Sequence, residues 1–135
     1  MKTVTTAVEL GNAIKNGEDE IIILGDLSAK VIKIKATGKV AWILAYSAVS
    51  VAITAVLTSP SLLLGAAGLV AEGTLVSLAS TLATSAVAVW GLGTTVQAIA
   101  IGVGAKNTKV LRKLKDNYEI VQNGSSQVII RKKRK

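Results

Sequence analysis

An almost uncharged stretch from Val40 to Ala105 limits what this chain can fold into more than any other feature. It contains 66 residues, and Glu72 is the single charged one. Helices at the surface of a small water-soluble domain need a polar face, whereas helices in a bilayer do not. The stretch therefore favours hydrocarbon as its solvent. The alternative is a soluble, all-buried helical core, including a form that is soluble first and inserts later.

Two membrane spans fit this stretch. A helix crosses the bilayer core with about 20 apolar residues. Residues 40–58 are uncharged and end before Pro60. Residues 73–105 are a longer uncharged run in which a tilt, or a bend at Gly91 or Gly93, absorbs the excess length. Between the two spans, near residues 59–73, we expect an outer loop. Three spans also fit the length of the stretch.

Basic residues on both sides of the stretch favour an even number of crossings. Four lysines precede it and five basic residues follow it, namely Lys30, Lys33, Lys35, Lys39, Lys106, Lys109, Arg112, Lys113 and Lys115. The positive-inside rule then places both termini in the cytoplasm. The expected fold is an integral membrane α-helical hairpin of two transmembrane helices, inserted in a small split cytosolic α/β unit. The expected location is the cell inner membrane, as a multi-pass protein.

The two ends, residues 1–39 and 106–135, predict short elements of a water-soluble unit. The expected elements are strands over 2–5, 20–24, 118–122 and 127–131 and helices from residue 6 to 16, over 27–36 and over 108–116. Thr6 and Glu9 form a capping-box pattern, and Asp26 is the expected cap of the second helix. Neither end is large enough to fold well alone, so we expect both to combine in one α/β unit.

Small residues dominate the uncharged stretch. Ala, Gly, Ser and Thr account for 36 of its 66 residues. In membranes small residues let helices approach closely, and hydroxyl groups bond across the contact. The expected helix-packing residues are Ala45, Ala48, Ala52 and Ala55. Either they pack the two helices of one hairpin, or hairpins also assemble into a homo-oligomer with a mildly polar interior.

An oligomer of this kind would have a pore, and a few polar residues are candidates for its lining or mouth. They are Glu72, Gln97, Ser77, Thr81 and Thr84. A ring of Glu72 carboxylates at the mouth would favour cations. Alternatively, Glu72 is hydrated in the outer loop and marks the start of the second helix, where the exposed N–H groups stabilise a carboxylate.

The residue types argue against an enzyme. The chain has no Cys and no His, which excludes disulfides, thiolate metal sites and the commonest general base. It has no Walker loop and no dinucleotide fingerprint, and the acidic run over residues 18–20 lacks the spacing of a calcium loop. We therefore expect no catalytic residue, no cofactor and no metal.

The net charge of +8 lies almost entirely in the last 30 residues. Each basic residue near an anionic lipid surface contributes about 1 kcal/mol of attraction. The expected contacts with lipid headgroups are Lys39, Trp42, Lys106, Arg131, Lys132, Lys133, Arg134 and Lys135. Nucleic acid is the less favoured partner, because the basic tail has no interleaved aromatic residues for base stacking. A solvated tail without a partner is a further alternative.

These features lead to two hypotheses about function. The first is a small, self-associating bacterial inner-membrane protein that forms or perturbs a pore. In size, paired spans and basic ends it is similar to holins, small membrane toxins and the membrane effectors of antiphage systems, with no shared motif. The second is a membrane-anchored adaptor whose cytosolic α/β unit binds a protein or another partner.

Overall fold

The two ends of the chain meet in one sheet. The computed structural model describes residues 2–58, 72–124 and 126–133, and within them four strands pair in the order β1-β2-β4-β3. The strands are β1 (Lys2–Val4), β2 (Glu20–Leu24), β3 (Tyr118–Asn123) and β4 (Gln127–Lys132). β1 runs parallel to β2, and β4 is antiparallel to both β2 and β3. Because β2 pairs directly with β4, strands from both ends complete a single sheet.

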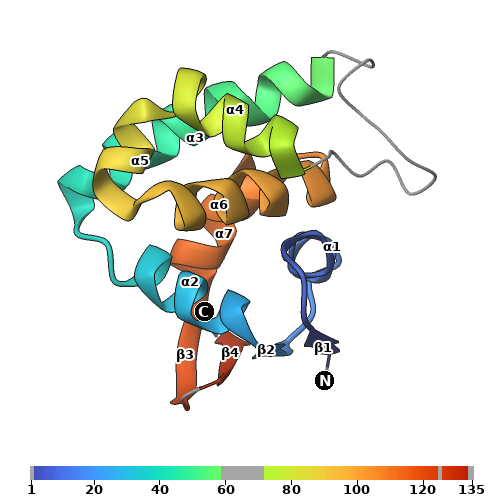
Figure 1. The fold of residues 1–135 in the computed structure, drawn as a ribbon. Helices are drawn as coiled ribbons and strands as arrows, with labels where there is room; N and C mark the ends of the chain where they lie inside the picture. The colour runs from blue at the N-terminus through green and yellow to red at the C-terminus, as the bar shows by residue number, and fades with distance from the viewer. Residues whose placement is uncertain (1, 59–71, 125, 134–135) are drawn as a thin grey trace.

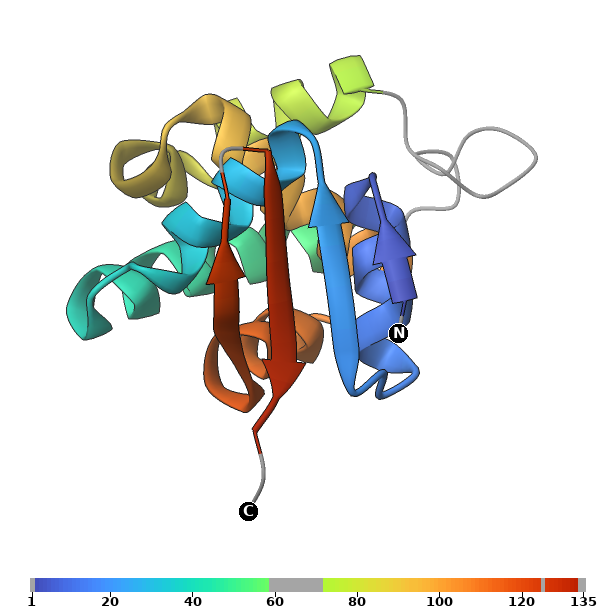
Figure 2. The same ribbon diagram turned by 90° about the horizontal axis from the view of Figure 1, so that it is seen from below.

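Helices cover one face of the sheet and leave the other face open (Figures 1 and 2). The helices next to the sheet are α1 (Ala7–Lys15), α2 (Asp26–Lys35) and α7 (Lys109–Asn117). Above them lies α6 (Leu92–Ala105), and α3 (Lys39–Thr58), α4 (Glu72–Leu82) and α5 (Thr84–Trp90) form the outer layer. On β2 the side chains of Ile21 and Ile23 alternate with half-buried neighbours and enter the core beneath the helices.

Local signals explain where the first elements begin. The Thr6 hydroxyl accepts from the Glu9 amide and the Glu9 carboxylate accepts from the Thr6 amide, so the predicted capping box starts α1. The predicted cap at Asp26 is wrong. Gly25 occupies the cap position with φ 76°, and Asp26 is the first helical residue. Glycine adopts this backbone conformation without steric cost.

Helix α6 is the centre of the helical layers, and it approaches its neighbours closely. A Cβ atom at Gly11 of α1 would overlap the carbonyl oxygen of Ile101 in α6. A Cβ atom at Gly104 would likewise overlap the backbone of Val8. These two glycines let the backbones of α1 and α6 pack together, which ties α6 to the sheet layer.

The predicted two-span hairpin is wrong. The region expected to form the second span is divided into α4, α5 and α6, which have 11, 7 and 14 residues. At a rise of about 1.5 Å per residue, even α6 is about 21 Å long, shorter than the bilayer core of about 30 Å. Gly91 ends α5 with φ 84°, which an α-helix does not accommodate. Ala83 separates α4 from α5 with φ −115° and ψ 37°, outside the α-helical range.

The first predicted span, by contrast, is one continuous helix. Among the described residues α3 alone is long and apolar enough to cross a membrane, and 33% of its most apolar window is buried in the domain. Core helices of soluble proteins share this length and composition. Residues 59–71, which include most of the expected outer loop, lie outside the described residues. The chain is therefore a mixed α/β domain that carries one long apolar helix in its outer layer.

Candidate functional site

Helix α3 exposes one uncharged face. Its exposed members, called the α3 face below, are Val40, Ile43, Leu44, Ser47, Val51, Thr54 and Thr58. The four large apolar side chains among them are between 54% and 74% exposed. Their spacing of three or four residues places all seven in one stripe along the helix. Exposed large apolar side chains grouped in this way are typical of a surface that binds another molecule or a membrane.

The opposite side of α3 is packed into the domain. Ala45 and Ala52, two of the predicted helix-packing residues, are completely buried, and Ala48 and Ala55 are half-buried beside them. The elements against this helix are α4, α5 and α6. These small side chains thus lie on the part of α3 that packs within this domain, together with the buried side chains of Trp42, Val49, Ile53 and Val56.

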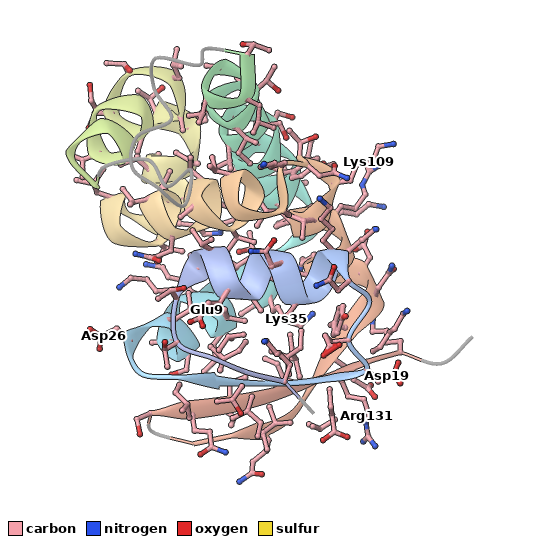
Figure 3. All side chains as sticks on the ribbon, turned by 90° about the vertical axis from the view of Figure 1, so that its right-hand side faces the viewer. Glu9, Asp19, Asp26, Lys35, Lys109 and Arg131 are labelled. Carbon is pink, nitrogen blue, oxygen red and sulfur yellow. The ribbon has the colours of Figure 1, made fainter. Side chains whose placement is uncertain are left out.

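Basic side chains of α7 lie next to α3. The Tyr46 hydroxyl of α3 donates to the Thr108 carbonyl oxygen at 3.1 Å, which joins the two helices. The guanidinium carbon of Arg112 lies 5.7 Å from the centre of the Tyr46 ring. Lys109, Arg112 and Lys113, called the α7 basic row below, are exposed because Val110, Leu111 and Leu114 fill the core side of α7. Figure 3 shows Lys109 at the level of the outer helical layer.

A groove of about 410 Å³ separates the two helices. Its lining residues are Lys39, Trp42, Ile43, Tyr46, Ser47, Arg112 and Asp116. Trp42 is only 8% exposed, with its ring stacked at 5.4 Å on Tyr46 and tilted at 6.0 Å against Trp90. The groove therefore has two aromatic rings, two cations and one carboxylate in its lining. Ile43 and Ser47 line the groove and also belong to the α3 face.

Two lysines fix the ends of α2 and α7 close to this groove. The Lys35 ammonium donates to the carbonyl oxygens of Leu114, Lys115 and Tyr118, and Lys115 donates to those of Lys35 and Thr37. Burial lowers the pKa of Lys35 to about 8, and the nearby ammonium groups of Lys133 and Lys115 act in the same direction. The Lys115 ammonium also lies 5.9 Å from the Trp42 ring centre, so it supports the floor of the groove.

Comparison with known proteins gives no match. No family model matches the sequence, no curated protein is significantly similar to it, and no solved structure matches its fold. The function proposed below therefore depends on the chemistry of the α3 face, the α7 basic row and the groove between them.

The predicted pore residues are spread over three helices. Ser77 and Thr81 lie one turn apart on α4, are exposed, and are joined by a hydrogen bond of 2.8 Å from the Thr81 hydroxyl to the Ser77 carbonyl oxygen. Thr84 is exposed at the start of α5. Gln97 of α6 is half-buried in a separate hollow of about 310 Å³. Glu72 is the first residue of α4, and its side chain lies outside the described residues.

The predicted headgroup contacts lie in two regions. Lys39 begins α3 and Lys106 follows α6, and both are exposed, whereas Trp42 is buried. The exposed residues Arg131, Lys132 and Lys133 lie at the end of β4, and Figure 3 shows Arg131 at the sheet, on the opposite side of the molecule from the outer helical layer. Arg134 and Lys135 lie outside the described residues.

Sequence patterns did not identify the α3 face or its alignment with the α7 basic row. Apolar residues surround α3 on all sides, so their periodicity does not distinguish its exposed side from its packed side. The basic and apolar residues of α7 alternate clearly and predict the helix, but they carry no information about which helix lies beside it.

Proposed function

We propose that this protein binds the surface of an anionic membrane through the α3 face, with the α7 basic row beside it contacting the headgroups. One observation supports the proposal most strongly: two residues of the exposed, uncharged α3 face, Ile43 and Ser47, share a groove with the exposed cations of Lys39 and Arg112. Helices that lie in the membrane interface combine these two features, because apolar side chains enter the acyl boundary while basic groups stay among the headgroups.

The two contributions act together. Lys39 and the three residues of the α7 basic row would each contribute about 1 kcal/mol near anionic lipid at moderate ionic strength. The exposed parts of Val40, Ile43, Leu44 and Val51 would add about 25 cal/mol for each Å² removed from water. One weak signal alone gives marginal membrane binding, and two signals together give stable binding.

In this orientation the protein acts as a membrane-bound adaptor. The open face of the sheet lies across the molecule from α3, so it remains in water and available to a partner (Figures 1 and 2). We favour this function over a pore because α3 is the one described helix long enough to cross a bilayer. Formation of a pore and of a homo-oligomer stay predictions.

Co-sedimentation with large vesicles tests the proposal. The wild type should bind vesicles of phosphatidylglycerol and phosphatidylcholine but not vesicles of phosphatidylcholine alone, and added salt should weaken the binding. The double variant Ile43→Ser/Leu44→Ser should bind at least about tenfold more weakly, because less apolar surface leaves water. Val121→Ser is the matched control, since Val121 is 39% exposed but lies on β3. Equal binding by the wild type and the double variant would contradict the proposal.

Dye release from the same vesicles separates the adaptor from the pore. Bound protein that releases no dye at any protein-to-lipid ratio supports the adaptor. Dye release that rises with the amount of bound protein supports the pore prediction instead.

A further inference from the structure

We infer that the groove between α3 and α7 holds the phosphate of one phospholipid headgroup between Lys39 and Arg112. The inference rests on the proposed membrane function and names the ligand that the same face binds. Both cations line the groove, and its volume of about 410 Å³ lies within the range of ligand sites in proteins.

Arg112 is suited to a phosphate. The carbon atom of its guanidinium lies over the Tyr46 ring at 5.7 Å from the ring centre, and this planar group carries several N–H donors. Those donors match two phosphate oxygens at once, and Lys39 supplies a second, compact positive charge from the start of α3. The two helices thus place both basic residues at the same groove.

The apolar part of the groove is suited to the rest of a lipid. Ile43 is 54% exposed and belongs to both the groove and the α3 face, so the groove opens onto the surface proposed to enter the membrane. A headgroup phosphate between Lys39 and Arg112 would therefore leave the glycerol and acyl chains directed along that apolar surface. A soluble phosphate compound would leave it in water.

A second hollow serves as a comparison. It measures about 490 Å³ and is lined by Glu119, Arg131, Lys132 and Lys133. Three of these residues are cations, but this lining includes no apolar side chain. It offers phosphate-binding charge without a surface for acyl chains, and for this reason we assign the lipid to the groove between α3 and α7.

Asp116 provides a second test, in which loss of its charge should change the affinity in the direction opposite to loss of the Arg112 charge. Its carboxylate lines the same groove and repels a phosphate, which lowers the net charge of the site from +2 to +1. Removal of this charge should tighten binding of a lipid phosphate. A headgroup held in the groove by its glycerol hydroxyl groups would instead lose a charged acceptor, so the sign of the change distinguishes the two modes of binding.

The test is a fluorescence titration of the full chain with dihexanoyl phosphatidylglycerol below its micelle-forming concentration. Trp42 lines the groove and is one of the two tryptophans of the chain, so a change in the summed tryptophan emission reports occupancy. Arg112→Gln and Asp116→Asn change the site. Lys15→Gln removes one exposed charge from the end of α1, outside both the groove and the α7 basic row, and is the matched control. Arg112→Lys retains the charge without the planar donors, and glycerol 1-phosphate supplies the phosphate without the acyl chains.

We expect saturable binding by the wild type and by Lys15→Gln within about twofold of each other, since this control leaves the groove and the α7 basic row intact. Arg112→Gln should weaken binding at least about tenfold, and the affinity of Arg112→Lys should lie between those of the wild type and Arg112→Gln. Asp116→Asn should tighten binding. Glycerol 1-phosphate should bind more weakly than the lipid.

Four results would overturn the inference: no saturation, equal binding by the wild type and Arg112→Gln, weaker binding by Asp116→Asn, or equal binding of glycerol 1-phosphate. None of them contradicts the vesicle binding proposed above. Loss of vesicle binding in Ile43→Ser/Leu44→Ser addresses that proposal separately.

Discussion

Lys35 at the end of α2 and Lys115 near the end of α7 each donate hydrogen bonds to the backbone that ends the other residue's helix. The Lys35 ammonium lies 2.7 Å from the Leu114 carbonyl oxygen, and the Lys115 ammonium lies 2.7 Å from the Lys35 carbonyl oxygen. The last carbonyl groups of a helix have no hydrogen-bond partner within that helix. A cation at this end also interacts favourably with the helix dipole. This exchange joins the N-terminal and C-terminal parts of the chain independently of the sheet.

Lys35→Met should destabilise the protein by about 1–3 kcal/mol at pH 7, because the half-buried carbonyl oxygens of Leu114, Lys115 and Tyr118 lose their donor. Urea unfolding followed by circular dichroism measures this change. Lys33→Met removes an exposed lysine from the same helix and should alter the free energy of unfolding little. Equal effects of the two substitutions would mean that the exchange does not stabilise the fold.

The pH dependence of stability should have two parts of opposite sign. The pKa of Lys35 falls from 10.5 to about 8 on folding, because burial and the ammonium groups of Lys133 and Lys115 outweigh the attraction of Asp116 and Glu119. Between these two values the unfolded chain binds more protons than the folded chain, so the contribution of Lys35 to stability rises with pH. Burial, with help from Asp19 and Glu18, raises the pKa of Tyr118 above 10.0, so its contribution is present below pH 10 and is lost as pH rises further.

Unfolding in urea at a series of pH values from 7.5 to 10 checks the first part. The wild type should gain stability across this range relative to Lys35→Met. Tyr118→Phe checks the second part at pH values above 10, where the wild type should lose stability relative to this variant. The substitution removes the titrating hydroxyl and its hydrogen bond of 2.6 Å to the Glu18 carbonyl oxygen. If the wild type and Lys35→Met show the same slope between pH 8 and 10, Lys35 does not lose affinity for its proton on folding.

Gly11→Ala should destabilise the domain by about 1–3 kcal/mol, because the added methyl group has no room between α1 and α6 and the two helices must separate. The measurement is the midpoint of urea unfolding. Gly38→Ala is the control, since no heavy atom lies within 4 Å of a Cβ atom there. Tolerance of alanine at Gly11 would show that α1 and α6 do not pack as closely as described.

The elements at the two ends follow directly from local sequence. The capping residues Thr6 and Glu9 start α1, the run of isoleucines forms β2 at the predicted residues 20–24, and the turn near Gly124 joins β3 to β4. Each of these signals acts between residues close in the chain, so no knowledge of the tertiary structure is needed to use it.

The division of the uncharged stretch into separate helices could not be predicted, because it depends on packing between helices and not on signals between residues close in the chain. An apolar run of Ala, Val, Leu and Thr is compatible both with a membrane span and with a set of short buried helices. Gly91, with its positive φ, lies where the chain turns from α5 into α6 and these two helices pack together. The candidate site depends on still longer-range contacts. Only the folded chain places Arg112 against Tyr46 and leaves Ile43 exposed beside them.

The most direct test of membrane binding through the α3 face uses a single fluorescent label. The chain contains no cysteine, so Ser47→Cys and Gln122→Cys each provide one attachment point for an environment-sensitive dye, the first on the α3 face and the second exposed on β3. On adding phosphatidylglycerol vesicles, the label at residue 47 should shift its emission to shorter wavelength and become protected from an aqueous quencher, while the label at residue 122 should not change. Emission that stays unchanged at residue 47, or that shifts equally at both positions, would contradict membrane binding through α3.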